Sequence, residues 1–285
     1  MKVLVTGVKG QLGYDVVKRF KSLNVECLGV DKEKFDLTDE RQTMDFIRNY
    51  RPDIVVHCAA YTAVDRAEED RAVCYAVNVL GTRYVAQACS EVGAKMVYIS
   101  TDYVFDGKGE VPYEVTDMPA PINYYGQTKY EGELEVKRLV DKAFIIRISW
   151  VFGKNGNNFV KTMLTLGKER KQLNVVCDQI GSPTYTFDVA RLITDMSVTN
   201  KYGTYHATNE GYCSWHEFAK EIFNLTGLDV CVNPISTEEY PTKAIRPKNS
   251  RMSKKSLDRS LFTRLPEWKD ALKRYLDELD LVNEK

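Results

Sequence analysis

The first 150 residues alternate short, almost wholly apolar runs with longer segments whose apolar residues recur at helical spacing. The apolar runs are rich in Val and Ile, which favours β-strands, and strands with so little polar alternation belong to parallel sheets covered on both faces. The pattern therefore predicts right-handed βαβ units in an α/β fold with a Rossmann-type, doubly wound parallel sheet. The expected strands are Lys2–Thr6, Glu26–Val30, Asp53–Cys58, Met96–Ser100 and Phe144–Ser149, and the expected helices are Gln11–Leu23, 40–50, 65–92 and Asn123–Val140.

In the second half of the chain, residues 151–285, strand-like and helix-like segments alternate less regularly, with Gly, Asn and Pro between shorter elements. We interpret it as a smaller C-terminal substrate-binding domain that sends some segments back to the main sheet of residues 1–150. A segment rich in Pro, Lys and Arg, 240–253, is expected to be a loop. The expected strands here are Asn174–Cys177, Thr204–Ala207 and Asp229–Asn233, and the expected helices are 186–198, 214–226 and 266–281.

The charge balance and the cysteines narrow the class of protein. The chain has 40 Lys and Arg against 40 Asp and Glu, so no net positive charge favours nucleic acid as a partner. No apolar run approaches the roughly 18 residues of a membrane span, and the start does not have the pattern of a signal peptide. The seven cysteines form no CxxC pair, which favours reduced thiols in a cytoplasmic protein.

A glycine-rich turn, Gly7-x-x-Gly10-x-x-Gly13, directly follows the first expected strand and opens the first expected helix. Glycines at these positions allow a tight turn, a close approach of backbone to pyrophosphate, and close packing of helix on strand. The helix N-terminus would direct free amides and a positive dipole at the phosphates. Glycine-rich turns also occur without a ligand, but Asp31 ends the second strand where a carboxylate binds the adenosine ribose. We therefore predict a dinucleotide site.

The choice between NADH and NADPH stays open from these residues. Asp31 favours NAD, because its carboxylate repels a 2′-phosphate, whereas Lys32 and Lys34 beside it offset that repulsion. Asp36-Leu37 is expected near the adenine, or else it leads into the next helix with Thr38 as its N-cap.

Tyr125 and Lys129 stand at i and i+4 of an expected helix and share one face. Thr101, next to Ser100, follows the fourth expected strand, at the sheet edge where Rossmann-type ligands bind. A ketone that accepts a hydride needs a proton, which a tyrosine can donate when a lysine ammonium favours its phenolate. Thr101, or Ser100, would hydrogen-bond the substrate oxygen. This set indicates hydride transfer and not a Ser/His/Asp hydrolase, because the three histidines occupy two expected strands and a helix start: His57, His206 and His216.

Several motifs appear in the order typical of one superfamily. The chain resembles the extended short-chain dehydrogenases/reductases, through its glycine-rich turn and through CAAYTAVD (58–65), NVLGT (78–82), STDYVFDG (100–107) and YYGQTK (124–129). Within that superfamily it is similar to the dTDP-4-dehydrorhamnose reductase family, through AAYTAVDRAE (59–68), RISWVFG (147–153), GSPTYT (181–186) and RPKNSRMS (246–253).

The resemblance implies roles for individual residues. It implies NAD(P)H as cofactor and a dTDP-sugar as substrate, with a homodimer as a candidate assembly. The implied catalytic residues are Thr101, Tyr125 and Lys129. The implied cofactor contacts are Gly7, Gly10, Gln11, Leu12, Gly13, Asp31, Asp36, Leu37, Ala59, Ala60, Tyr61, Thr62, Tyr125 and Lys129, and the implied substrate contacts are Thr101, Asp102, Trp150 and Arg246.

Some of these positions have a second interpretation. Trp150 is expected in a pocket wall or else in the core, and Arg246 is expected on the nucleotide diphosphate or else in a solvated loop. The charged run 65–71 is expected to be a solvated helix start. Some family members hold magnesium through glutamates at a dimer contact, but position 15 here is Asp15, so we expect no metal.

The expected function is NAD(P)H-dependent reduction of the C4 ketone of dTDP-4-dehydro-L-rhamnose to dTDP-L-rhamnose. Dehydratases of the superfamily carry Thr-Asp-Glu, whereas Tyr103 follows Thr101-Asp102 here, which argues against dehydration. Two alternatives stay open. One is a nucleotide-sugar epimerase, and the other is a non-catalytic, NADP-binding regulatory subunit that resembles the beta subunit of methionine adenosyltransferase.

Overall fold

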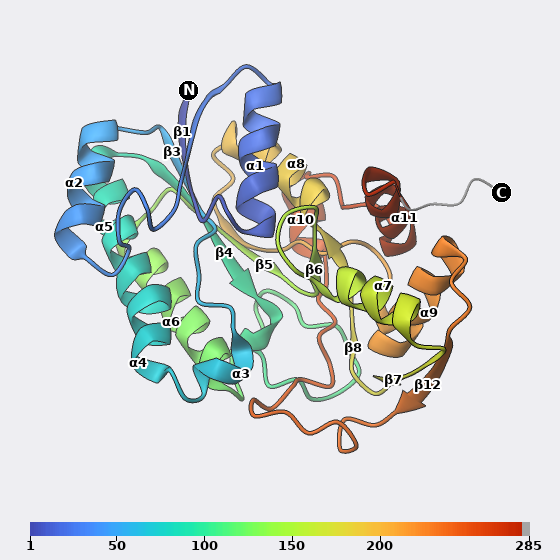
Figure 1. Ribbon diagram of the computed structural model, residues 1–285. Coiled ribbons are helices and arrows are strands. Elements are labelled where there is room, and N and C mark those ends of the chain that lie inside the picture. The colour runs from blue at the N-terminus through green and yellow to red at the C-terminus, as the bar shows by residue number, and fades with distance from the viewer. Residues whose placement is uncertain (281–285) are drawn as a thin grey trace.

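The computed structural model describes residues 1–280, and a six-stranded sheet lies at its centre (Figure 1). All neighbouring strands in this sheet run parallel. The order β10-β5-β4-β3-β1-β2 changes direction between β1 and β3, which creates the topological switch point where ligands bind in such sheets. The predicted fold class is confirmed. The strands are β1 (Lys2–Thr6), β2 (Glu26–Val30), β3 (Ile54–His57), β4 (Lys95–Thr101), β5 (Ala143–Ile148) and β10 (Gly203–His206).

Helices cover both faces of the sheet, and successive strand residues divide between them (Figure 1). Val3 and Val5 pack on one face, and Leu4 packs on the other. Because both sides are buried, the strands need apolar residues at every position, which explains the unbroken apolar runs of the sequence. The first face holds α1 (Gln11–Ser22), α8 (Thr186–Ser197) and α10 (Lys255–Arg259), and the second holds α2 (Glu40–Tyr50), α5 (Thr82–Val92) and α6 (Tyr124–Leu139).

The single helix predicted over 65–92 is wrong, because the chain turns at 68–70 and then widens into a π-helix. All three side chains of this turn bind other segments: Glu68 Oε1 accepts from the Tyr124 amide, Asp70 Oδ2 accepts from the Tyr61 hydroxyl, and Glu69 pairs with Lys243. These tertiary contacts break a segment whose residues are all compatible with a helix. The separate elements are α3 (Val64–Ala67), α4 (Arg71–Tyr75), the π-helical η1 (Ala76–Gly81) and α5.

The second half of the chain builds a further apolar core beside the sheet, where Phe218, Leu272 and Tyr275 are buried. Of the predicted helix 266–281, the structure has Trp268–Glu278, and residue 281 lies outside the described residues. None of the helices within residues 1–280 combines the length and the apolar character needed to cross a membrane. The elements here are β6 (Val151–Phe152), α7 (Phe159–Glu169), β7 (Gln172–Val176), β8 (Ile180–Gly181), β9 (Thr184–Tyr185), β11 (Cys213–Ser214), α9 (Trp215–Thr226), β12 (Cys231–Ile235) and α11 (Trp268–Glu278), with a 3₁₀ turn η2 (Asp102–Val104) after β4.

Candidate active site

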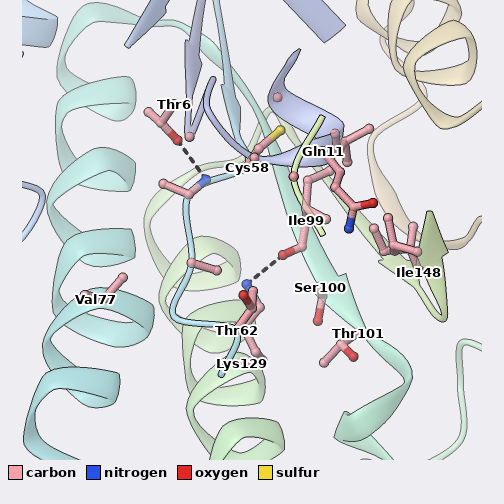
Figure 2. Close-up of a pocket in the computed structure, with 18 of the residues that line it drawn as sticks. Thr6, Gln11, Cys58, Thr62, Val77, Ile99, Ser100, Thr101, Lys129 and Ile148 are labelled. Atoms are coloured by element: carbon pink, nitrogen blue, oxygen red, sulfur yellow. Dashed lines mark hydrogen bonds between the residues drawn. The ribbon is translucent and has the colours of Figure 1, made fainter. Parts of the chain in front are cut away.

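A cavity of about 860 Å³ lies at the carboxyl ends of β1 to β5, across the switch point between β1 and β3. Figure 2 shows the ends of several strands around it, with Thr6, Cys58, Thr101 and Ile148 labelled. Most residues predicted from the sequence line this cavity, although they come from distant parts of the chain. They are Gly7, Gly10, Gln11, Leu12, Gly13, Asp31, Asp36, Leu37, Ala59, Ala60, Thr62, Thr101, Asp102, Tyr125, Lys129 and Trp150.

The glycine-rich turn is built so that only glycine fits at two of its positions. Gly7 has a φ of +72°, and a Cβ on Gly13 would lie 2.3 Å from the Gly7 carbonyl oxygen. Gly10 caps α1 without a side chain, so the first amides of the helix stay available to a ligand. The turn therefore fits the pyrophosphate of a dinucleotide.

At the end of β2, Asp31 holds a lysine that the sequence reasoning did not consider. The Asp31 carboxylate accepts from the Glu33 amide at 3.0 Å, which lowers the pKa of Asp31, and Lys9 Nζ lies 3.3 Å from the same group. Of the two lysines expected to offset the charge of Asp31, Lys32 lines the cavity and Lys34 is not among the lining residues. A cation from the glycine-rich turn itself thus lies beside the carboxylate.

The segment after β2 reaches the cavity through Asp36 and Leu37. Asp36 Oδ1 accepts from both the amide and the hydroxyl of Thr38 at 2.8 Å. Thr38 is not the cap of α2, because Asp39 accepts from the Gln42 amide in that role.

The loop that follows β3 lies along the cavity, and a hydrogen bond to β1 fixes the first residues of this loop. The Ala59 amide donates to Thr6 Oγ1 at 3.2 Å, as Figure 2 shows. Tyr61 is the one residue of the predicted stretch Ala59–Thr62 that is not among the lining residues. Its amide donates to Asn78 Oδ1 at 2.8 Å, and its ring packs in a cluster with Tyr125.

Tyr125 and Lys129 project from α6 toward the carboxyl end of β4, where Thr101 lies. Asn123 caps this helix by accepting from the Gly126 amide at 2.8 Å, which fixes its first turn. Lys129 Nζ donates to the Ile99 carbonyl oxygen at 2.7 Å, a contact drawn in Figure 2. One of the three ammonium protons is engaged in this way, and the others can serve a ligand in the cavity.

Burial shifts the pKa of both groups. Burial lowers the pKa of Lys129 to about 7, and the charge of Glu133 opposes this change. Burial raises the pKa of Tyr125, the Asp102 carboxylate raises it further, and a hydrogen bond with the Thr101 hydroxyl opposes the rise. Without a ligand Tyr125 is therefore a neutral phenol at neutral pH, which is the form that can donate a proton.

A buried ion pair lies behind these groups. Glu133, one turn after Lys129 on α6, accepts from Arg147 in β5 through two bonds of 2.7 Å. It also accepts from Ser100 Oγ at 2.6 Å, so the proton of the Ser100 hydroxyl is engaged by Glu133, whereas the Thr101 hydroxyl donates to Asp102 in the cavity wall. The bidentate pair ties α6, β4 and β5 together directly beneath the catalytic candidates.

Asp102 is a buried carboxyl group in the cavity wall. Its Oδ1 accepts from Thr101 Oγ1 at 3.0 Å, whereas its Oδ2 has no hydrogen-bond partner within the described part of the chain. Burial raises the pKa of Asp102 to about 6, and the hydroxyls of Ser250 and Thr101 oppose this rise. A buried carboxylate oxygen without a partner is suited to accept a hydrogen bond from a hydroxyl of a ligand.

Arg246 lies between two cavities. It lines a second cavity, of about 750 Å³, and its guanidinium donates to the Tyr103 hydroxyl at 2.9 Å and to Asp65. Tyr103 lines the first cavity and meets Tyr125 edge to face, with ring centroids 5.5 Å apart. The solvated helix start expected over 65–71 is therefore wrong in part, because Asp65 is an anchor for Arg246.

Besides Lys9 and the Glu133–Arg147 pair, Tyr103 and Ile99 had no role assigned from the sequence. Tyr103 was considered only as a difference from dehydratases, yet it joins Arg246 to the cavity. Ile99 contributes only a backbone carbonyl, so no side-chain pattern could have indicated its contact with Lys129.

Comparison with known proteins gives matches over almost the whole chain. Residues 1–281 match the family described as RmlD substrate binding domain. The spore coat polysaccharide biosynthesis protein SpsK of Bacillus subtilis (strain 168) is 41% identical over 277 residues, which cover 97% of each chain. The dTDP-4-dehydrorhamnose reductase of Aggregatibacter actinomycetemcomitans is 39% identical over 286 residues, 95% of this chain and 97% of that one.

A solved structure is also closely similar. The crystal structure of dTDP-4-dehydrorhamnose reductase from Bacillus anthracis str. Ames in complex with NADP has a TM-score of 0.95 and 48% sequence identity to this chain. The match covers 98% of this chain and 100% of that structure, so the cavity and the second half of the chain lie within the shared fold.

Proposed function

The chain belongs to the RmlD substrate binding domain family, and from this we propose that it is an NADPH-dependent reductase. The proposed reaction converts the C4 ketone of dTDP-4-dehydro-L-rhamnose to the alcohol of dTDP-L-rhamnose. The names of the relatives support the substrate, and the NADP in the B. anthracis structure supports the cofactor. The observation that carries the proposal is that Thr101, Tyr125 and Lys129 line one cavity together with the glycine-rich turn.

The proposed proton transfer starts from the resting state of Tyr125. When bound, the reduced nicotinamide supplies the hydride that C4 receives. Tyr125 donates its phenol proton to the ketone oxygen. The Thr101 hydroxyl, which donates to Asp102 in the ligand-free protein, turns to donate its hydrogen bond to that oxygen as negative charge develops. The product is an alcohol, and a phenolate is left on Tyr125.

Lys129 stabilises the phenolate and fixes the cofactor in this proposal. Its ammonium favours the negative form of Tyr125 by charge, one helical turn away. The protons not engaged by Ile99 are available to the ribose next to the nicotinamide. Burial of the lysine makes its charge sensitive to pH near neutrality in the free protein.

The binding roles follow from position in the sheet. We assign the cofactor to residues 1–150, with pyrophosphate on Gly7–Gly13, the adenosine ribose on Asp31 and adenine near Asp36 and Leu37. Lys9 and Lys32 beside Asp31 allow a 2′-phosphate, which supports NADPH over NADH. The sugar nucleotide is assigned mainly to residues 151–285, with Asp102, Trp150 and Arg246 as contacts. A cytoplasmic location is consistent with a reaction that consumes NADPH.

The test is the replacement Tyr125→Phe, assayed by loss of NADPH absorbance with enzymatically prepared dTDP-4-dehydro-L-rhamnose. Removing the general acid should lower kcat by about 10²- to 10⁴-fold. NADPH binding, measured by fluorescence titration, should stay close to that of the wild type because the glycine-rich turn is unchanged.

The matched control is Tyr124→Phe, because Tyr124 is the neighbouring tyrosine and its ring stacks with Arg71 outside the cavity. This variant should retain turnover. Near-normal turnover by Tyr125→Phe would contradict the mechanism. A wild type that binds NADPH but never oxidises it would favour the regulatory alternative, and tightly retained NAD would favour an epimerase.

A further inference from the structure

Trp150 has an unfavourable backbone conformation, which contacts with neighbouring residues must stabilise. It follows β5 and lines the cavity, with a φ of +49°, in the left-handed region that residues with a side chain rarely adopt. Such a conformation costs about 1 to 3 kcal/mol and persists only where the surrounding structure determines it. The contacts of the Trp150 ring therefore show which residues stabilise this conformation.

A second tryptophan, 65 positions later in the sequence, provides the main contact. The rings of Trp150 and Trp215 are stacked, with centroids 3.7 Å apart and an angle of 12° between their planes. Trp215 is the first residue of α9, and the capping box of Ser214 and Glu217 fixes it there. Phe159 packs on Trp215 with centroids 4.6 Å apart, which restricts it further.

The Trp150 ring also packs closely against the backbone of β8, at Gly181. β8 and β11 pair antiparallel, so Gly181 lies opposite Cys213, two residues before Trp215. A Cβ added to Gly181 would lie 2.7 Å from Cε2 of Trp150. The same two-stranded ladder thus carries Trp215 and leaves room for the ring that it stacks on.

The sheet order places this assembly at the sugar end of the cavity. β5 neighbours β4, whose end carries Thr101, whereas Asp31 lies at the end of β2, at the far edge of the sheet. The cofactor's adenosine and Trp150 are therefore assigned to opposite ends. A change in the position of the Trp150 ring should therefore alter the affinity for the sugar nucleotide and leave the affinity for the cofactor unchanged.

We infer that Trp215 is a positioning residue for the sugar nucleotide: by stacking on Trp150 it fixes the wall against which the sugar lies. The inference rests on the proposed function. Trp215 itself is not among the residues that line the cavity, so it acts through Trp150.

The experiment compares Trp215→Ala and Trp215→Phe with the wild type in steady-state assays and in calorimetric titrations with dTDP-L-rhamnose. An aromatic pair contributes about 0.5 to 1.5 kcal/mol beyond its buried area, so Trp215→Ala should raise the KM and the Kd for the sugar nucleotide about 3- to 10-fold. The KM for NADPH should stay unchanged and kcat should fall less than the sugar KM rises. Trp215→Phe should restore most of the affinity, because a phenyl ring still stacks.

Two further variants separate the loss of the Trp150–Trp215 stack from a general loss of stability. Gly181→Ala, which moves Trp150 from its other side without removing an aromatic ring, should raise the same KM. Trp268→Phe is the matched control: Trp268 is buried in the same apolar core and meets Phe218 edge to face, so its replacement should lower the melting temperature and leave the sugar KM unchanged.

The inference is overturned if Trp215→Ala binds dTDP-L-rhamnose as tightly as the wild type, or if Trp268→Phe weakens sugar binding equally. Failure of the proposed function gives a different result, since a wild type without turnover contradicts the reductase assignment. In that case the binding titrations alone decide whether Trp215 positions the sugar nucleotide.

Discussion

Asp102 illustrates the compromise between stability and binding at the scale of a residue. The residue is 3% exposed, and one of its carboxylate oxygens has no partner within residues 1–280. A buried ionised group without full hydrogen bonding destabilises the folded state. The group is retained in the wall of the cavity where the sugar is expected.

We expect Asp102→Asn to stabilise the protein in a pH-dependent way while weakening sugar binding. The pKa rises from 3.8 in the unfolded chain to about 6 in the folded protein, so the folded state binds more protons between these values. The wild type's free energy of unfolding therefore falls as pH rises through this window, and the full cost, up to about 3 kcal/mol, is present above pH 6.

Urea unfolding of both proteins at about pH 4 and about pH 7.5 measures this difference. The advantage of Asp102→Asn should be small at the lower pH and complete at the higher one. Asp195→Asn, an exposed change on α8, is the control and should show no such dependence. An equal difference at both pH values would mean that the titration of Asp102 is not the cause.

At the scale of an element, the segment 240–248 connects the two halves of the chain as a strap. Lys243 pairs with Glu69, the Ala244 amide donates to Asp65, and Arg246 pairs with Asp65. The first pair is solvent-exposed at both ends, whereas Arg246 is largely buried against Tyr103. The strap thus contains one ordinary surface ion pair and one that reaches the cavity wall.

This difference gives a test of whether Arg246 binds the diphosphate of the substrate. A charge-assisted hydrogen bond contributes about 1.5 to 3 kcal/mol, so Arg246→Met should raise the KM for the sugar nucleotide tenfold or more. Asp65→Asn should raise that KM less than Arg246→Met does, because the guanidinium stays in place through its hydrogen bond to the Tyr103 hydroxyl.

Lys243→Met is the matched control in the same strap, and steady-state kinetics of the three variants measures the outcome. It removes a cation and an ion pair but leaves Arg246 in place, so the KM should not change. An equal effect of Lys243→Met and Arg246→Met would show that closure of the strap matters and the charge of Arg246 does not.

Element boundaries show where local patterns suffice. β1, β2 and α2 begin and end where the apolar pattern and the punctuating residues predict. α7 was missed although Asn158 caps it and Val160, Met163 and Leu164 follow at helical spacing. The Gly and Asn residues before this helix are typical of a loop, and they precede the helical spacing directly.

One strand was predicted two residues too early. The sequence favoured Asp229–Asn233, whereas β12 spans Cys231–Ile235 and includes Pro234. A proline is tolerated there because, among residues 1–280, β12 pairs on one side only, with β7. The pairing partner, and not the apolar pattern, set the position of this strand.

At the scale of the whole molecule, elements of the second half complete the main sheet and contribute to one of the cores packed on it. β10 pairs with β5 at the edge of the main sheet, and α8 packs beside α1 on one of its faces. Figure 1 shows α8 of the second half beside α1 of the first. The sheet is therefore incomplete without residues beyond 150.

We expect the protein to unfold in one cooperative transition. Trp215 and Trp268 lie in the second half, and Trp150, at its border, stacks on Trp215, whereas far-UV circular dichroism reports on helices throughout the chain. Urea curves from tryptophan fluorescence and from circular dichroism should coincide. A fluorescence midpoint well below that of circular dichroism would show that the second half unfolds independently.

Although the net charge of the chain is zero, several positively charged side chains are concentrated around the proposed ligand sites. Lys9, Lys32 and Lys129 line or border the site proposed for an anionic cofactor, and Arg246 borders the site proposed for the diphosphate. Electrostatic attraction of anionic ligands depends on this local field and not on the net charge.

The amino-acid sequence by itself determined the parallel sheet, the glycine-rich turn and the shared face of Tyr125 and Lys129. Each of these depends on residues within one strand, turn or helix, where spacing decides which groups meet. Only the tertiary structure decided that Arg246 binds Asp65, that Trp150 stacks on Trp215, and that the helix expected over 65–92 is interrupted. These features arise from contacts between segments far apart in the chain, and their energies override local preference.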